Sequence, residues 1–158
     1  MKKISFLIKL AKEEKLQAVE PSDEIKKAYI QRSEESLSSA KALLKIGNLK
    51  DSVALAYYSM YHCLLAALFR IGIKCENHTA SIILLKEVFG VDDTKISKAK
   101  SERVDKQYYV DFSVNSEEAN NAIKAAEGFI AELTNLIATF SEESITEYRK
   151  KATDLFTK

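Results

Sequence analysis

Apolar and polar residues alternate along the chain at a spacing typical of helices, and one segment is apolar almost throughout. Between residues 52 and 69 no side chain is charged, and three tyrosines and a histidine lie inside the apolar run. A helix that is apolar on nearly every face must be surrounded by other helices, and its few polar groups then need buried partners. These groups form either a hydrogen-bonded seam in the core or the wall of a binding site: Tyr57, Tyr58, Tyr61 and His62.

Most other segments carry an apolar stripe at helical spacing, and capping residues mark their ends. Ser22 followed by Asp23 and Glu24 is typical of a helix start, and Gly47 is typical of a helix end. No segment shows the two-residue alternation that is typical of a strand. The pattern predicts helices over residues 3–14, 22–46, 48–71, 76–89, 94–109, 115–140 and 141–156.

This succession of helices predicts an all-α fold. We expect an up-and-down bundle of four or five helices, with short flanking helices at both termini. The chain has 158 residues, the size of one domain with one core, so we expect a single helical domain over residues 1–158. One proline and four glycines suit long helices with few connections.

Composition excludes several classes of protein. An apolar content of 46% argues against a disordered chain. A net charge of +1 argues against a broad basic surface, although it is compatible with a local basic patch. Two cysteines give no disulfide framework, as is typical of a reducing compartment. The run at 52–69 just approaches the length of a membrane span, about 20 residues, but its hydroxyls and histidine suit hydrocarbon poorly. We therefore predict a cytoplasmic protein that does not span a membrane.

The familiar sequence motifs of catalysis and metal binding are absent. The chain has no glycine-rich phosphate loop, no nucleophile elbow and no histidine pair at metal-ligand spacing. Cys75 and His78 have the spacing of half a zinc site, but the remaining pair, His62 and Cys63, is adjacent and points in two directions on a helix. We predict neither a metal nor a cofactor.

The two histidines each have two interpretations. His62 is either a core histidine bonded to a neighbour or a proton carrier, since the ordinary pKa of imidazole lies near neutrality. His78 lies at a helix entry beside Asn77 and Thr79, where backbone N–H groups favour an anion. In the other interpretation, His78 is an exposed residue of that first turn.

Residues 101–112, SERVDKQYYVDF, form the most suggestive cluster. If this segment is helical, Asp105 and Tyr109 share the face next to that of Arg103. A planar cation beside aromatic rings suits a phosphate and a stacked base. The same residues could instead form an internal network that fastens the segment to the bundle.

Four segments follow one another in a distinctive order: AYYSMYHCLLAALFRIGI, NHTASI, SERVDKQYYVDF and EEANNAIKAAEGFIAEL. Together they resemble the HEPN domain (higher eukaryotes and prokaryotes nucleotide-binding) in its small prokaryotic form. The resemblance covers about residues 22–140 and leaves the helices at 3–14 and 141–156 as flanking additions. It implies a helical bundle that often dimerises, and that is often encoded beside a minimal nucleotidyltransferase in toxin–antitoxin-like systems.

Other members of this family are metal-independent ribonucleases, marked by an arginine, four to six residues and then a histidine. Arg103 matches the arginine, but Tyr108 stands where the histidine would be, and no histidine follows it. A tyrosine with an ordinary pKa of about 10 can act as an acid at pH 7 but scarcely as a base. A ribonuclease built on Arg103 and Tyr108 would therefore need a displaced histidine, His78 or His62.

Three functions remain open. The first is a HEPN-like module, a homodimer that binds a nucleotide or RNA phosphate and partners a nucleotidyltransferase. The second is a metal-independent ribonuclease toxin, and the third is a protein-interaction bundle whose terminal helices serve a partner. The ligand-binding residues predicted for the first are Arg103, Asp105, Tyr109, Tyr58, His62 and Asn77.

Overall fold

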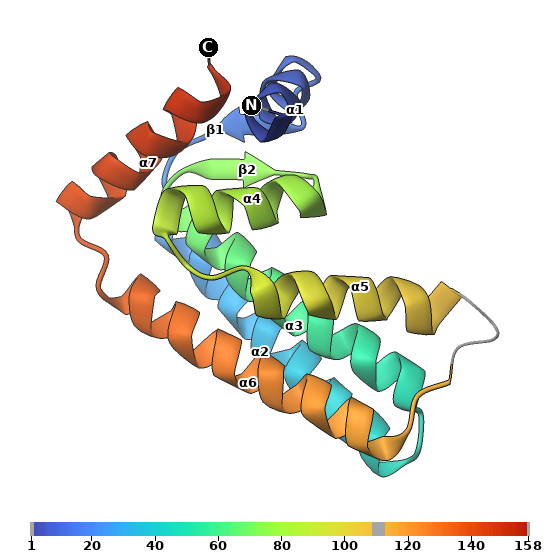
Figure 1. Ribbon diagram of the computed structural model, residues 1–158. Helices are drawn as coiled ribbons and strands as arrows, with labels where there is room; N and C mark the ends of the chain where they lie inside the picture. The colour runs from blue at the N-terminus through green and yellow to red at the C-terminus, as the bar shows by residue number, and fades with distance from the viewer. Residues whose placement is uncertain (1, 109–112, 158) are drawn as a thin grey trace.

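The computed structural model describes residues 2–108 and 113–157, with the backbone alone for residues 104–108. Its centre is a bundle of four helices, in which α3 (Leu49–Arg70) packs against the other three (Figure 1). These are α2 (Asp23–Lys45), α5 (Thr94–Tyr108) and α6 (Ser116–Ala138). The predicted all-α bundle is confirmed.

Helix α3 lies in the middle of the bundle because almost none of its faces is polar. Side chains around most of its circumference are buried, among them Tyr57, Met60 and Leu64, and a stripe of Leu55, Tyr58, His62 and Phe69 is half-buried. Among the described helices, α3 alone is long and apolar enough to cross a membrane, but most of that apolar stretch is buried by its neighbours. Its composition is therefore that of a core helix.

Helix α2 approaches α3 closely because small residues face it. The Ser33 hydroxyl donates to the backbone carbonyl of Ser59 at 2.6 Å, and the Ser52 hydroxyl donates to that of Ala40 at 2.7 Å. All four of these residues are small, and all four are buried. These bonds satisfy the buried hydroxyls and fix the two helices at short range.

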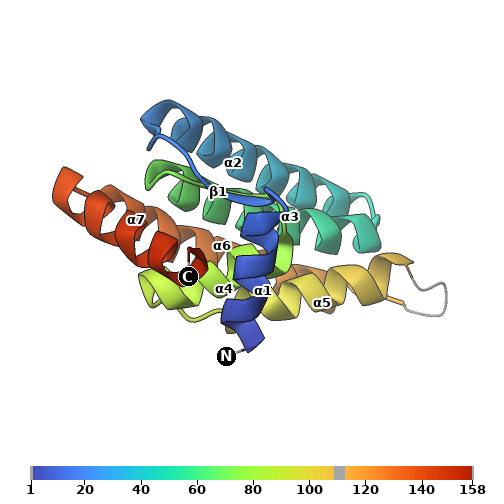
Figure 2. The same cartoon turned by 90° about the horizontal axis from the view of Figure 1, so that it is seen from above.

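A second layer covers one end of the bundle (Figures 1 and 2). It consists of α1 (Lys2–Lys12), β1 (Leu16–Ala18), β2 (Ile73–Cys75), α4 (His78–Phe89) and α7 (Glu142–Phe156). The two strands pair antiparallel, with Leu16 opposite Cys75. The sequence pattern did not predict this ribbon, because three residues are too few to show an alternating pattern.

The apolar stripes of α1 and α7 are buried in the core. Leu7 and Leu10 of α1 and Ile145 and Phe156 of α7 belong to the same continuous core as the bundle. Helices α1 and α7 lie close together as a result (Figures 1 and 2). The two flanking helices predicted from the sequence are therefore parts of the folded domain.

Side-chain caps define the starts of α2 and α4. The Ser22 hydroxyl accepts a hydrogen bond from the Ile25 amide at 3.0 Å, as predicted. Helix α4 begins at His78 because Asn77 is extended and its side-chain oxygen accepts from the Ala80 amide at 2.9 Å. Asn77 thus places His78 in the first turn of α4.

Candidate functional site

Arg103 of α5 lies over two tyrosines of the central helix. Its Nη1 donates to the Tyr58 hydroxyl at 3.1 Å. Its Cζ lies 5.4 Å from the centre of the Tyr58 ring and 5.5 Å from that of Tyr57. A cation within about 6 Å of aromatic faces is attracted by them, so α3 provides a platform for the half-buried guanidinium.

His78 reaches the same tyrosines from the start of α4. Its Nδ1 shares a hydrogen bond of 2.7 Å with the Tyr57 hydroxyl. Its ring stacks on Tyr61, with the ring centres 3.8 Å apart. Among the described residues Nε2 has no hydrogen bond, so this nitrogen is left for a ligand. Tyr57 therefore links His78 to Arg103, although α4 and α5 are separate elements.

The ionisation states of these residues at pH 7 favour the binding of an anion. Burial, the charge of Arg103 and the charge of Lys100 lower the pKa of His78, which is therefore uncharged at pH 7. Burial raises the pKa of the Tyr57 hydroxyl, which therefore stays protonated. The cluster holds the positive charge of Arg103 beside neutral hydrogen-bonding groups.

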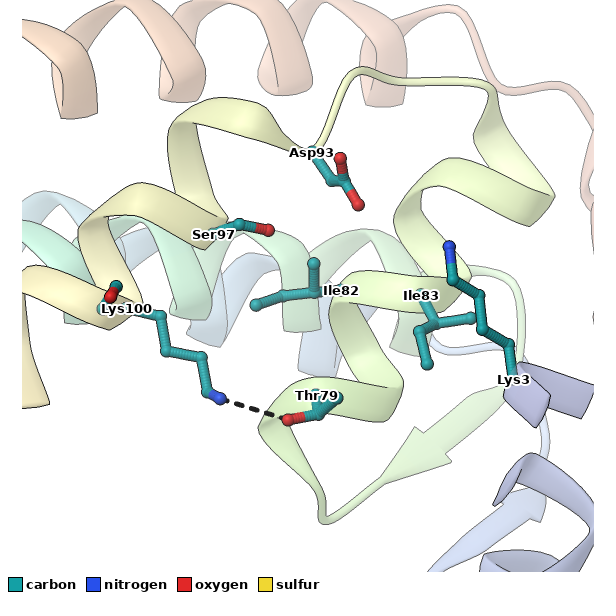
Figure 3. Close-up of a pocket in the computed structure, with 8 residues that line it drawn as sticks. Lys3, Thr79, Ile82, Ile83, Asp93, Ser97 and Lys100 are labelled. Atoms are coloured by element: carbon teal, nitrogen blue, oxygen red, sulfur yellow. Dashed lines mark hydrogen bonds between the residues drawn. The ribbon is translucent and has the colours of Figure 1, made fainter. Parts of the chain in front are cut away.

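The N-terminus of α4 adds to this positive character. Its first turn contains no acidic residue, and the helix dipole is positive at this end. Lys100 of α5 donates to the Thr79 hydroxyl at 3.1 Å, which brings a second cation to the same turn (Figure 3). Arg103, Lys100 and the start of α4 thus form one positively charged region.

His62 faces a different neighbour. Its Nδ1 lies 3.3 Å from the Ser36 hydroxyl of α2, and its ring lies beside Tyr29 and Tyr58. Burial lowers its pKa to about 4, and the charge of Arg32 and that of His78 in its protonated form act in the same direction. His62 is thus uncharged at pH 7 and belongs to a polar seam between α2 and α3, while Tyr57 and Tyr58 form the wall of the candidate site.

The structure brings together part of the predicted site. Arg103, Tyr58 and His78 lie in one cluster, whereas Asn77 uses its side chain to cap α4. Cys75 donates its thiol hydrogen to the Asn77 carbonyl. The side chains of Asp105 and Tyr108, and the whole of Tyr109, lie outside the described residues.

The sequence interpretation did not place Lys100 in a site, and it left Tyr57 open between a core seam and the wall of a site. Lys100 lies three residues before Arg103, so helical spacing alone would have put both cations on one face of α5. Tyr57 is one of three tyrosines in a helix that is buried on nearly all sides. Nothing in its local sequence distinguishes it from Tyr61.

Known proteins resemble this chain over most of the bundle. The family model described as the HEPN domain matches residues 26–137. A UPF0332 protein of Pyrococcus horikoshii is 45% identical over 60 residues, covering 38% of this chain and 42% of that protein. A UPF0332 protein of Archaeoglobus fulgidus is 27% identical over 114 residues, covering 68% of this chain and 91% of that protein.

A third relative is a protein of Methanocaldococcus jannaschii that bears the name "Putative toxin". It is 30% identical over 110 residues, which cover 65% of this chain and 81% of that protein. The chain thus spans less than half of the Pyrococcus protein but most of the other two. Helices α1 and α7 and strand β1 lie entirely outside the residues that the family model matches.

Proposed function

Because the chain belongs to the HEPN domain family, we propose that it is a HEPN module that binds a nucleotide or an RNA phosphate at Arg103. The observation that carries this proposal is the position of the Arg103 guanidinium, over the rings of Tyr57 and Tyr58 and beside the uncharged His78. Guanidinium groups bind phosphate oxygens in a planar fork. Lys100 and the start of α4 add positive charge to the same region.

The aromatic platform explains why an arginine rather than a lysine suits this position. Tyr58 accepts one hydrogen bond from Nη1, which fixes the plane of the guanidinium. A fixed plane loses less side-chain entropy when it binds a phosphate. The bound phosphate would then lie next to Nε2 of His78. This nitrogen can form a hydrogen bond with the phosphate or exchange a proton with it.

We expect Arg103→Ala to weaken binding of a single-stranded RNA about tenfold or more, because a charge-assisted hydrogen bond contributes roughly 1.5–3 kcal/mol. Arg103→Lys should give an intermediate loss, since lysine keeps the charge but not the planar fork. The measurement is fluorescence anisotropy of a labelled twelve-nucleotide RNA with chelator present, over several salt concentrations. The salt dependence should also become shallower, as expected when one phosphate contact is lost.

Lys98→Ala is the matched control for this series. Lys98 lies on the same helix, but its side chain is 77% exposed and pairs with Glu102. Removing it changes the net charge by the same amount without touching the cluster. Equal losses for Lys98→Ala and Arg103→Ala, with both variants folded by circular dichroism, would mean that binding is diffuse and does not use this site.

A second function, a metal-independent ribonuclease, is favoured by the position of His78. RNA cleavage without a metal needs a base for the 2′-hydroxyl, an acid for the leaving oxygen and a cation for the phosphate. We propose His78 as the base, Arg103 as the cation and Tyr108 as the acid. His78 would then supply the histidine that the sequence lacks after Arg103.

Under this second function, His78→Gln and Arg103→Ala should each slow RNA cleavage about 100-fold, within the range for a lost acid–base group. The pKa of His78 is lowered, so the base stays available below its ordinary pKa of about 6.5, and the cleavage rate should hold at pH 6. The measurement is cleavage of a labelled RNA in chelator between pH 5 and pH 8. If the wild-type protein leaves the RNA intact while still binding it, the ribonuclease is excluded and the binding module stands.

We further propose that the module works as a homodimer in the cytoplasm, with a minimal nucleotidyltransferase as partner. The name of the Methanocaldococcus relative supports a toxin–antitoxin-like setting. The family resemblance supports dimerisation and the nucleotidyltransferase. The burial of α1 and α7 in the core argues against the third function, in which the apolar stripes of the terminal helices serve a partner.

A further inference from the structure

A pocket of about 550 Å³ opens between α1, α4 and α5 (Figure 3). Thr79 and Lys100 line it, and their neighbours His78 and Arg103 form the cluster described above. Lys3 of α1 forms another part of its wall. This part of the wall comes from α1, which lies outside the residues that the family model matches.

Helices α4 and α5 each contribute residues to both the pocket and the Arg103 cluster. Lys100 and Arg103 lie three residues apart on α5, so they project from the same face of the helix. Thr79 follows His78 in the first turn of α4, and the Lys100–Thr79 hydrogen bond joins the two helices at this point. A ligand whose phosphate lies at Arg103 can therefore continue past Lys100 into the pocket.

The pocket combines an apolar surface with charges of both signs. Ile82 and Ile83 of α4 present aliphatic side chains, and Lys3 and Lys100 lie on opposite sides of them (Figure 3). A flat base can pack on the aliphatic surface, while the two ammonium groups can contact phosphates. The volume is in the range of small-molecule sites, about 300–1,000 Å³.

Asp93 contributes a carboxylate to the pocket wall. Its carboxylate is half-buried, lines the pocket and forms no hydrogen bond or ion pair with the residues that the structure describes. Its neighbour Asp92, by contrast, uses its carboxylate to bind the amide and hydroxyl of Thr94. Asp93 therefore has two acceptor oxygens available for a ligand.

We propose that this pocket binds the nucleotide next to the phosphate held by Arg103, and that it prefers guanine. The proposal rests on the proposed function, because it names the substrate class of the same region: a single-stranded RNA. Guanine carries two adjacent donors, N1–H and N2–H, on its Watson–Crick edge, which match the two oxygens of a carboxylate. Adenine, cytosine and uracil each lack this pair of donors.

The experiment compares four labelled heptanucleotides, UUUGUUU, UUUAUUU, UUUCUUU and UUUUUUU, by fluorescence anisotropy in chelator. The wild-type protein should bind the guanine-containing RNA about tenfold more tightly than the others, as expected for one good bidentate pair. Asp93→Asn should remove this preference, because an amide has one acceptor oxygen, while binding of UUUUUUU stays the same. Lys3→Ala should weaken binding of all four RNAs by a similar factor, as expected for a phosphate contact.

Two control variants match these changes. Glu87→Gln removes an exposed carboxylate of α4, and Lys9→Ala removes an exposed ammonium of α1, and neither residue lines the pocket. Both should leave the affinities and the base preference unchanged. An equal affinity for all four RNAs, or a guanine preference that survives in Asp93→Asn, would overturn the proposal.

The two proposals fail in different ways. If the wild-type protein binds RNA through Arg103 but shows no base preference, the pocket proposal is wrong and the proposed function stands. If it binds none of the four RNAs at low salt, the proposed function itself is wrong. The Arg103→Ala variant, measured on the same RNAs, separates these outcomes.

Discussion

Gly72→Ala is expected to lower the free energy of unfolding by about 3 kcal/mol, because a Cβ atom at this position meets both strain and crowding. Gly72 has φ +83°, a conformation that L residues adopt at a cost. An added Cβ would lie 2.5 Å from the Val19 carbonyl oxygen and 2.8 Å from Nε of Arg149. The first of these neighbours is backbone and cannot move aside easily.

The crowding at Gly72 reflects a junction of three segments. Gly72 follows the end of α3, its carbonyl accepts from the Val19 amide at 2.8 Å, and the Val19 carbonyl accepts from Nη2 of Arg149 at 3.0 Å. The residue thus lies where the bundle, the segment after β1 and α7 meet. An alanine would push these segments apart, so the substitution should also weaken the packing of the second layer.

Gly90→Ala is the control that separates strain from crowding. Gly90 also has a positive φ, +68°, but a Cβ atom there would have nothing within 4 Å. Its expected loss is therefore about 1 kcal/mol, the strain alone. The measurement is urea unfolding followed by circular dichroism. Equal losses in the two variants would show that the junction relaxes around the added methyl group.

Leu7→Ala is expected to lower the free energy of unfolding by about 3 kcal/mol, in the range for a buried leucine. Leu7 of α1 is fully buried and belongs to the continuous core. Removing its side chain loses apolar burial and leaves a cavity between α1 and its neighbours. The same urea titration measures the loss.

Ile46→Ala is the matched control, because Ile46 is 71% exposed at the end of α2. A change at this residue should stay within about 0.5 kcal/mol. If Leu7→Ala left stability unchanged but altered the oligomeric state measured by analytical ultracentrifugation, α1 would be an interface and not a part of the core. That result would support the third function, a protein-interaction bundle.

The order and type of the helices were predictable from the sequence because their signals are local. The uncharged run at 52–69 could be stable only inside a bundle, and α3 occupies that place. Ser22 and Gly47 mark the ends of α2 through hydrogen bonds and dihedral angles within a few residues. Arg103 and Tyr58 could be selected as site candidates from their chemistry.

Only the tertiary structure decided which of these residues meet. The strands β1 and β2 are too short to leave a pattern, and each is stabilised by a partner far away in the sequence. His78 and Arg103 lie on different helices, and both contact Tyr57 because α4 and α5 pack against the same part of α3. Periodicity and capping act within a few residues, whereas such contacts depend on how the whole core packs. The sequence by itself therefore determined the helices and the family, and the packing determined the candidate site.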